Sequence, residues 1–561
     1  MKLISFIFCV FIIFGKANAQ QPLWLAEGNT NLTLYPQSGP PFWGLIANDA
    51  IGNVYVTGAF KDSVKFGNTT LTSSGDHDMF IAKMDSTGQW IWAKNAGGQD
   101  FDAATSIAVD YQGNVLICGG FGGSFQMGAT TLTAIGLNDV FVAKLDSSGN
   151  WLWVSTAGGA NADAGMGICT NQQGHVFVTG EFRDTLQAGA QSIVSLGLSD
   201  GFVGKLDGTN GQWQWLSHIG SKGNSDKVAK IKADVQGNLY LCGMFADSLH
   251  CGTVLLTNPS INPSLSNFSE LFLAKMNDVG QFQWAISGGG YDKDQATSLA
   301  IDPQGMVYVC GYTSNDTIVF GANTVIQPST DHLLVAAANA LGQWQWVKTA
   351  RVGSKYPVYD IAAPANGKVF VAGSFWISAI FGTDTLLGDF NPPANLGSSE
   401  VCLASIDGNG QWQGAMKAYG KGDDFCASIS ADNKGNIWLH GSFADSLRCG
   451  QLHLEASDTG RNEIFVLRLR DTTAVINGLA MHNKESFASL FPNPAEGNLT
   501  LLSSEEATWK LYNINGQLIW QQHCLPHNAT RLAVSDWPRG IYYYVFQGKH
   551  GLQQTGLLHL D

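Results

Sequence analysis

One stretch of the chain returns at nearly constant spacing. The segment GNVYVTGAF at residues 52–60 has related copies at residues 113–121, 174–182, 237–245, 305–313, 367–375 and 435–443. Successive copies begin 61, 61, 63, 68, 62 and 68 residues apart. Self-similarity at such a period indicates a repeat architecture, in which each repeat is one supersecondary unit. We therefore expect seven equivalent units, and each residue can be compared with its counterparts in the others.

Each unit contains signals for four short strands. In the second unit they lie at residues 104–110, 114–121, 139–145 and 151–155, with Gly113 and Gly149 in the intervening turns. Four strands in about 60 residues, joined by glycine-containing turns, are typical of a propeller blade. The second strand is almost entirely apolar, as expected when both of its faces are covered. These patterns predict an all-β fold, a seven-bladed β-propeller with four-stranded blades.

The fourth strand alternates aromatic residues, as in Trp151 and Trp153. Alternation places both rings on one face of the sheet. Sugar binding is an alternative role, but recurrence in six units favours packing between blades. The last unit ends near residue 471 without such a strand, whereas residues 22–27, with Trp24, resemble a fourth strand that lacks the other three. We expect this N-terminal strand to pair with the final blade and close the ring, which would remove an exposed sheet edge.

Three patterns within the unit carry a family resemblance. GNVYVTG-F, D-FVAKLD--G-W-W and GG---D-A--IA-D are similar to the bacterial β-propeller repeat family often called SBBP repeats. The resemblance covers residues 22–471 and implies the propeller scaffold. It implies no particular activity, because that family is defined by its scaffold.

The N-terminus has the order of a secretory signal peptide. Lys2 precedes an apolar run over residues 3–14, and Ala17-Asn18-Ala19 forms an A-x-A cleavage site. Residues 1–19 are therefore expected to be a signal peptide, followed by the propeller at residues 20–471. No later stretch approaches the ~18 apolar residues of a membrane-spanning helix, so no transmembrane segment is predicted.

The C-terminal part loses the repeat. Residues 472–488 are predicted to be a linker, and short strands with turn signals predict a small β-sandwich over residues 489–561. The order FPNP, LYNING and PRGIYYY is similar to the C-terminal sorting domain of the Bacteroidetes type IX secretion pathway. The resemblance implies export through the periplasm to the outer cell surface or the medium, with the type IX machinery as a partner of residues 489–561. An adhesive sandwich module is the alternative.

Composition excludes one class of partner. The formal net charge is −14, charged residues make up 14% of the chain, and no arginine occurs between Gln20 and Phe182. Nucleic-acid binding requires clustered Lys and Arg, so no nucleic-acid partner is expected.

Nine cysteines remain after removal of the signal peptide. Cys118, Cys242 and Cys310 share a repeat position that Thr57 and Ala372 fill elsewhere. Residues that interchange with Thr and Ala are interpreted as small buried side chains. A disulfide between Cys242 and Cys251 is the alternative. The pair of histidines in HCLPH (523–527) lies in a strand context with a proline, which disfavours a metal site. No metal and no cofactor are predicted.

Acidic residues recur at two positions of the unit. They stand at the start of the third strand and before the first strand; the members are Asp78, Asp139, Asp200, Glu270, Asp331, Glu400 and Glu463, and Asp102, Asp163, Asp226, Asp294 and Asp424. A ring of carboxylates that binds cations is one hypothesis. The interpretation we favour is structural: such acids accept hydrogen bonds from backbone N–H groups and fix the loops between blades.

Motifs for common catalytic sites are absent. The chain has no HExxH, GxSxG, Walker or EF-hand sequence. A sialidase would need three arginines around the substrate carboxylate, and the sequence does not group three in this way. No catalytic residue is predicted.

Loop length indicates which face of the propeller binds. The connections after the first and third strands are minimal glycine turns, whereas the other two are longer and vary between units. Long variable loops on a rigid scaffold commonly carry binding sites. Aromatic and charged residues without counterparts on this face suit sugar or protein recognition, and filling of gaps between blades is the alternative for each ring. The predicted ligand-binding residues are Trp43, Phe101, Tyr291, Lys293, Arg351, Lys355, Tyr356 and Trp376.

Three functions remain open. The leading hypothesis is a secreted or cell-surface propeller that binds a polysaccharide or protein without catalysis. The others are a secreted glycan hydrolase or lyase, whose carboxylates would be loop acids specific to one blade, and a purely structural surface or adhesion component.

Overall fold

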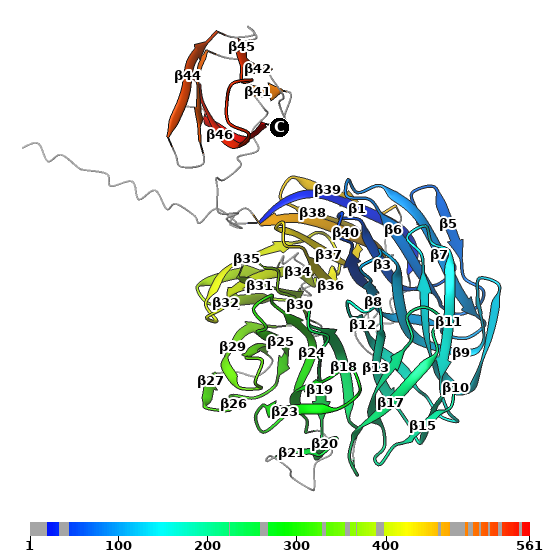
Figure 1. The fold of residues 1–561 in the computed structure, drawn as a ribbon. Helices are drawn as coiled ribbons and strands as arrows, with labels where there is room; N and C mark the ends of the chain where they lie inside the picture. Colours follow the sequence, from blue (N-terminus) through cyan, green and yellow to red (C-terminus); the bar gives the residue numbers. More distant parts are fainter. Residues whose placement is uncertain are drawn as a thin grey trace, which may run out of the picture. The chain divides into compact units, whose positions relative to one another are not determined.

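In the computed structural model, the description covers residues 20–32, 44–223, 225–258, 268–327, 332–353, 359–365, 367–388, 398–457, 462–471, 488–491, 498–503, 506–513, 517–525, 530–548 and 553–560. The chain divides into two compact units, Met1–Asp471 and Thr472–Asp561. Within these ranges, all regular secondary structure is β-strand (Figure 1). The all-β class predicted from the sequence is confirmed.

The first unit consists of sets of four antiparallel strands. In every set but the last, the strands follow one another in sequence order from the innermost to the outermost. The first three such sets are β2 (Gly44–Asn48), β3 (Val54–Phe60), β6 (Asp78–Met84) and β7 (Trp90–Gly98); β8 (Ala103–Val109), β9 (Val115–Met127), β10 (Thr130–Leu145) and β11 (Trp151–Ala157); and β12 (Ala164–Thr170), β13 (Val176–Phe182), β16 (Asp200–Leu206) and β17 (Trp213–Gly220).

The later sets follow the same order. They are β18 (Lys227–Ala233), β19 (Leu239–Phe245), β22 (Glu270–Met276) and β23 (Phe282–Gly288); β24 (Asp294–Ile301), β25 (Val307–Thr313), β28 (His332–Ala338) and β29 (Trp344–Val352); β30 (Asp360–Ala362), β31 (Lys368–Phe375), β34 (Glu400–Asp407) and β35 (Trp412–Ala418); and β36 (Phe425–Ala431), β37 (Asn436–Ala444), β40 (Asn462–Asp471) and β1 (Gln20–Leu32).

The sets are arranged around a common centre (Figure 1). The innermost strands β2, β8, β12, β18, β24, β30 and β36 contact one another in that order, and β36 also contacts β2. The arrangement is that of a β-propeller. Its second and third strands are buried, as β3 and β6 show along their whole length, because neighbouring sheets cover both faces. The turns use glycine where the backbone enters the left-handed region, as at Gly113 with φ 82° and Gly149 with φ 84°.

The connection between the second and third strands differs from the sequence prediction. The sequence predicts a longer connecting segment over residues 122–138, but in the structure β9 continues to Met127, the chain turns at Gly128, and β10 begins at Thr130. The result is a β-hairpin. The equivalent hairpins are β4 (Ser63–Phe66) with β5 (Thr69–Thr72), β14 (Thr185–Ala188) with β15 (Gln191–Val194), β20 (Ser248–Cys251) with β21 (Val254–Thr257), β26 (Thr317–Phe320) with β27 (Asn323–Ile326), β32 (Ser378–Phe381) with β33 (Asp384–Leu387), and β38 (Ser446–Cys449) with β39 (Leu452–Glu455).

Each hairpin extends to the preceding sheet. The register places Gly97 opposite Gln126 and Ile219 opposite Cys251. Each hairpin thereby pairs with part of the outermost strand of the preceding sheet. Fewer backbone N–H and C=O groups at that sheet edge are left unpaired.

The N-terminal strand β1 pairs with β40 of the last set. The antiparallel register runs from Gln20 opposite Asp471 to Leu32 opposite Asn462. On its other side β1 pairs with β4, with Asn29 opposite Lys65. The pairing expected from the missing fourth strand is present.

The alternating tryptophans lie between adjacent sheets. The indole Nε1 of Trp92 donates a hydrogen bond to the carbonyl of Ser147 in the next set at 3.2 Å, and Trp153 does the same to Gly208 at 3.1 Å. Trp24 on β1 donates to the carbonyl of Ser86 at 3.2 Å. The packing interpretation of the aromatic stripe is confirmed by these contacts.

The second unit contains two sheets around one core. One sheet orders β41 (Ala488–Phe491), β42 (Asn498–Ser503) and β45 (Thr530–Ala533); the other orders β44 (Leu518–Cys524), β43 (Ala507–Tyr512), β46 (Gly540–Gly548) and β47 (Gln553–Leu560). Leu499 and Leu501 from the first sheet pack with Trp509 and Leu511 from the second. Alternate residues of facing strands therefore build the core, as in a sandwich.

Candidate functional site

One position on the innermost strands breaks the symmetry of the repeat. Its members are recognised because each pairs with the same position of the second strand: Leu45, Ser106, Gly167, Lys230, Ser298, Asp360 and Ser428. Lys230 on β18 and Asp360 on β30 are the charged members. Two residues later, Lys232 stands where the other strands have Ala47, Ala108, Cys169, Ala300, Ala362 and Ser430. At these two positions, charged residues therefore occur on β18 and β30 only.

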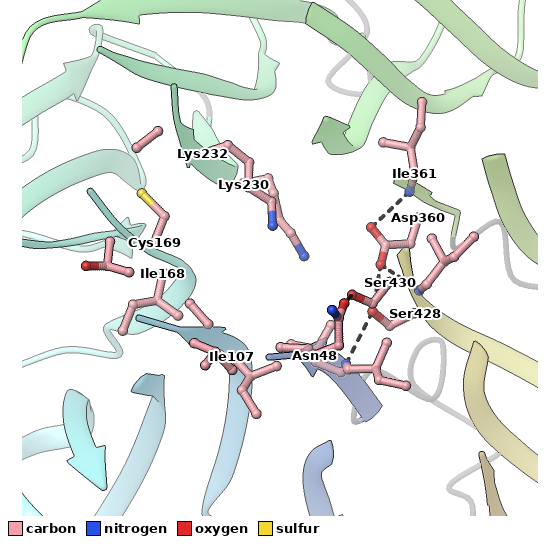
Figure 2. A pocket seen from close by; sticks show the side chains of 18 residues that line it. Asn48, Ile107, Ile168, Cys169, Lys230, Lys232, Asp360, Ile361, Ser428 and Ser430 are labelled. Atoms are coloured by element: carbon pink, nitrogen blue, oxygen red, sulfur yellow. Dashed lines mark hydrogen bonds between the residues drawn. The ribbon is translucent and has the colours of Figure 1, made fainter. Parts of the chain in front are cut away.

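These charged residues line a cavity at the centre of the innermost strands (Figure 2). Its volume is about 250 Å³, and β2, β8, β12, β18, β30 and β36 contribute the lining. Lys230 and Lys232 project from β18 toward the open centre, and Asp360 lies across from them (Figure 2). Ile107 and Ile168 also line it, but their side chains are 7% and 2% exposed and belong to the cores between the sheets. The surface that faces the centre of the propeller is therefore mainly polar.

Asp360 is buried and its two carboxylate oxygens accept four hydrogen bonds. Ser298 Oγ donates to Oδ1 at 2.5 Å and the Ile361 N–H donates to Oδ1 at 3.0 Å. Ser428 Oγ donates to Oδ2 at 2.6 Å and the Ile429 N–H donates to Oδ2 at 2.9 Å. Donors from β24, β30 and β36 therefore meet on one carboxylate, which fixes these innermost strands relative to one another.

The pKa of Asp360 lies below its usual value. Burial acts to raise this pKa, but the positive charge of Lys230 and the hydrogen bonds from Ser298, Ser428 and the Ile429 N–H together outweigh it. Asp360 is consequently ionised at neutral pH. With both oxygens already occupied by donors, it is poorly placed to act as a general base or nucleophile.

The two lysines have a different environment. Lys232 is exposed to the open centre and Lys230 is half-exposed, and neither ammonium group has a hydrogen bond or ion pair with another described residue. The pKa of Lys232 is lowered, first by its partial removal from water among the innermost strands and then by the charge of Lys230. The site therefore holds two ammonium groups whose charge the single carboxylate does not balance.

The eight residues predicted from the sequence divide into three groups. Trp43, Lys355 and Tyr356 lie outside the described residues. Phe101 and Trp376 are half-buried: the ring of Phe101 lies 5.2 Å from that of His77, and the Trp376 N–H donates to the Gly353 carbonyl at 2.7 Å. Tyr291, Lys293 and Arg351 are exposed.

Two of the exposed residues lie together. Tyr291 is 62% exposed, and its ring lies 5.5 Å from that of Phe268 in an edge-to-face arrangement. Lys293 follows in the same loop and forms an isolated bridge with Ser269, next to Phe268. Arg351 lies on β29, where its backbone pairs with Ile380 of the hairpin β32–β33. The structure thus adds Phe268, which lies two residues before β22, to the predicted pair Tyr291 and Lys293.

The charged residues of the central cavity were not predicted from the sequence. The predicted residues without counterparts belong to the long-loop face, whereas Lys230, Lys232 and Asp360 lie on the first strand of their repeats. A signal was available: the segment KIKAD at residues 230–234 has lysine at two positions where the other units have neutral or, at Asp360, acidic residues.

The recurrent acids hold loops in place. Asp102 accepts hydrogen bonds from the Gly98 N–H at 2.7 Å and the Gly122 N–H at 3.1 Å, and Asp139 accepts one from the Ile135 N–H at 2.9 Å. These bonds confirm the structural interpretation at those positions. Asp331 lies outside the described residues.

Several of these acids have pKa values raised by burial. For Asp102, Asp163 and Asp226 the pKa is about 7, because desolvation outweighs the backbone hydrogen bonds that lower it. A nearby acid, Asp78 in the case of Asp102, raises the value further. These carboxyls bind protons in the folded protein at a pH where the unfolded chain has released them.

We expect the first unit to be more stable at about pH 5 than at about pH 8. A raised carboxyl pKa contributes stability that is complete below the unfolded value and is lost as the pH rises through about 7. Calorimetry across this range should show a falling melting temperature. The triple variant D102N/D163N/D226N should flatten the profile, and a profile as steep as that of the wild-type protein would contradict the assignment.

Cysteine and histidine side chains are the other candidate metal-binding groups of the chain. The nine cysteines from Cys118 to Cys524 are free and buried, which confirms the small-buried-residue interpretation and replaces the alternative of a Cys242–Cys251 disulfide. His523 is exposed and contacts Glu506 at 3.1 Å, while His527 lies outside the described residues. In the parts of the chain that are described, groups of three or more His, Cys, Asp or Glu side chains suited to a metal ion do not occur.

Residues 489–557 match the family described as secretion system C-terminal sorting domain. The match supports the type IX sorting domain predicted from the sequence, and it indicates export to the cell surface or secretion. Among the residues that the structure describes, no helix has the length and apolar character needed to cross a membrane.

Two curated proteins share part of the sequence. The chain is 26% identical over 236 residues to "Uncharacterized WD repeat-containing protein L264" of Acanthamoeba polyphaga mimivirus, covering 35% of this chain and 16% of that protein. It is 25% identical over 299 residues to "Regulatory protein FlaEY" of Caulobacter vibrioides, covering 49% of this chain and 30% of that protein. The chain thus spans less than a third of the length of either relative.

Solved structures with a distant likeness include two enzymes. A quinohemoprotein alcohol dehydrogenase from Comamonas testosteroni has a TM-score of 0.36 and 10% identity, covering 85% of this chain and 79% of that one. The NanB sialidase from Streptococcus pneumoniae has a TM-score of 0.32 and 9% identity, covering 79% of this chain and 70% of that one. At this level of similarity neither enzyme's chemistry transfers to this chain.

Proposed function

We propose that residues 20–471 form a closed, seven-bladed β-propeller of the SBBP repeat type, preceded by a signal peptide at residues 1–19. We further propose that a linker at residues 472–488 joins it to a sandwich-type sorting domain at residues 489–561, which engages the type IX machinery. The pairing of β1 with β40 supports closure. So does the core that joins the first and last sets, in which Val56 and Phe80 pack with Trp438 and Val466.

On this scaffold, the proposed function is binding of a polysaccharide or protein by the long-loop face, without catalysis. The observation that carries the proposal is the exposed ring of Tyr291, held by Phe268 and adjacent to Lys293. An exposed aromatic face beside a cation suits stacking on a sugar ring or anchoring of a protein side chain. The ring is supported from one side, so that little conformational entropy is lost on binding.

The proposal is tested by replacing Tyr291 with alanine. We expect the wild-type protein to bind a component of a glycan array or an extracellular protein panel, and Y291A to reduce that binding roughly tenfold or more, since truncation of an aromatic anchor removes about 2 kcal/mol. Tyr111, which is 69% exposed on a short turn at the opposite end of the strands, provides the matched control Y111A.

Equal binding by Y291A and wild-type protein would reject the Tyr291 site. Turnover of a polysaccharide by the purified protein would instead favour the hydrolase or lyase hypothesis. Surface retention with neither binding nor turnover would favour a structural or adhesion component.

A further inference from the structure

We propose that the central cavity binds a small anion that carries more than one carboxylate. The proposal is independent of the long-loop face, because it concerns Lys230 and Lys232 on β18 and the surroundings of Asp360 on β30. Apart from Asp360 on β30, the other innermost strands present neutral residues at the equivalent positions, so the repeat itself does not require the two lysines.

The positive charges of Lys230 and Lys232 are not neutralised by a direct contact. Neither ammonium group has an ion pair or a hydrogen bond with any described residue. A structural lysine in this protein is paired instead: Lys144 lies 3.0 Å from Asp110 and also donates to the Gly208 carbonyl at 2.9 Å. Two like charges brought side by side on one strand repel each other, and an anion between them would relieve that repulsion.

Asp360 does not serve as their counterion through a direct contact. No ion pair links it to either lysine, and its oxygens are taken by the four donors described above. Two ammonium groups and one carboxylate leave one net positive charge in the cavity. A cation is therefore disfavoured there, although the chain as a whole carries a formal charge of −14.

The size and lining of the cavity limit the ligand. A cavity of roughly 150 Å³ accommodates benzene, and this one measures about 250 Å³. Ile107 and Ile168 are 7% and 2% exposed and present little aliphatic surface, while Ser430 Oγ donates a hydrogen bond to Asn48 Oδ1 at 2.5 Å among the lining residues (Figure 2). These features suit a short carbon skeleton with carboxylates that reach both ammonium groups, for which charge-assisted hydrogen bonds are strong.

The test is calorimetric titration of the full-length protein with citrate, succinate and inorganic phosphate at low ionic strength, with glycerol as an uncharged comparison. We expect one citrate or succinate to bind per chain and glycerol to give no heat. The variants K230S and K232A introduce residues that other innermost strands carry at these positions, so the fold should tolerate both. The double variant should weaken binding roughly tenfold or more.

The control is K222A, which removes an exposed lysine outside the cavity. It should bind citrate as the wild-type protein does. Absence of heat with every anion, tighter binding of phosphate than of either carboxylate, or equal binding by the double variant and K222A would each overturn the proposal. Since Tyr291 is not involved, none of these outcomes bears on the long-loop face.

Discussion

Replacement of Asp360 by alanine is expected to lower the stability of the first unit by at least about 3 kcal/mol, because hydrogen bonds to a charged group contribute about 1.5–3 kcal/mol each and several donors would lose a buried acceptor. The donors come from three of the innermost strands, with Ser298 Oγ at 2.5 Å and Ser428 Oγ at 2.6 Å. Chemical denaturation at neutral pH measures the loss.

The pH dependence distinguishes this effect from a general loss of packing. The pKa of Asp360 is lower in the folded protein than its usual value, so its contribution is present above about pH 4 and disappears as the pH falls below that value. The difference between D360A and wild-type protein should therefore shrink in acid. Asp316 is exposed on a hairpin, and D316A should leave stability unchanged. A D360A protein as stable as D316A would show that the carboxylate does not hold the innermost strands together.

Deletion of residues 20–27 should lower the melting temperature of the first unit by roughly 5 °C or more, since each kcal/mol lost from a large domain shifts it by about 2 °C. The deletion removes most of the pairing between β1 and β40, in which Trp24 lies opposite Arg468. It also removes the indole hydrogen bond from Trp24 to the Ser86 carbonyl at 3.2 Å. The edge of β40 would then be exposed, which favours aggregation of the heated protein.

The second unit provides the control for this deletion. Removal of residues 553–560 deletes β47, which pairs only with β46 among the strands of that unit. This change should alter the unfolding of the second unit and leave the melting temperature of the first unit unchanged. If the thermal unfolding transition of the first unit is unchanged after deletion of residues 20–27, β1 is not an integral strand of the propeller. The single variant W24A should give a smaller shift in the same direction.

Much of the fold could be predicted because the copies of the repeat can be compared with one another. The alternating Trp151 and Trp153 predicted a face that packs between sheets, and the indole of Trp153 does contact the next set. The hairpins were missed because segments such as residues 122–138 contain four glycines and only short apolar runs, which hides their short strands. They form because Phe125 and Leu132 pack against the preceding sheet, a contact that local pattern does not reveal.

The candidate site was less predictable than the fold. Tyr291 and Lys293 were found because they lack counterparts on the long-loop face, and Phe268 was missed because it lies 23 residues earlier in the sequence, just before β22. Lys230 and Lys232 were missed because residues on the first strand of a repeat were interpreted as structural. Their surroundings depend on Asp360, which is two repeats away in sequence.

The sequence by itself determined the strand order of the repeat, the N-terminal strand that pairs with β40, and the sorting domain, since each rests on local pattern or on comparison between copies. Only the tertiary structure decided which side chains share the centre. In a ring, innermost strands from distant repeats face one another, so Lys230, Lys232 and Asp360 converge on one cavity of about 250 Å³. Their convergence follows from the curvature of the whole ring, which no single repeat encodes.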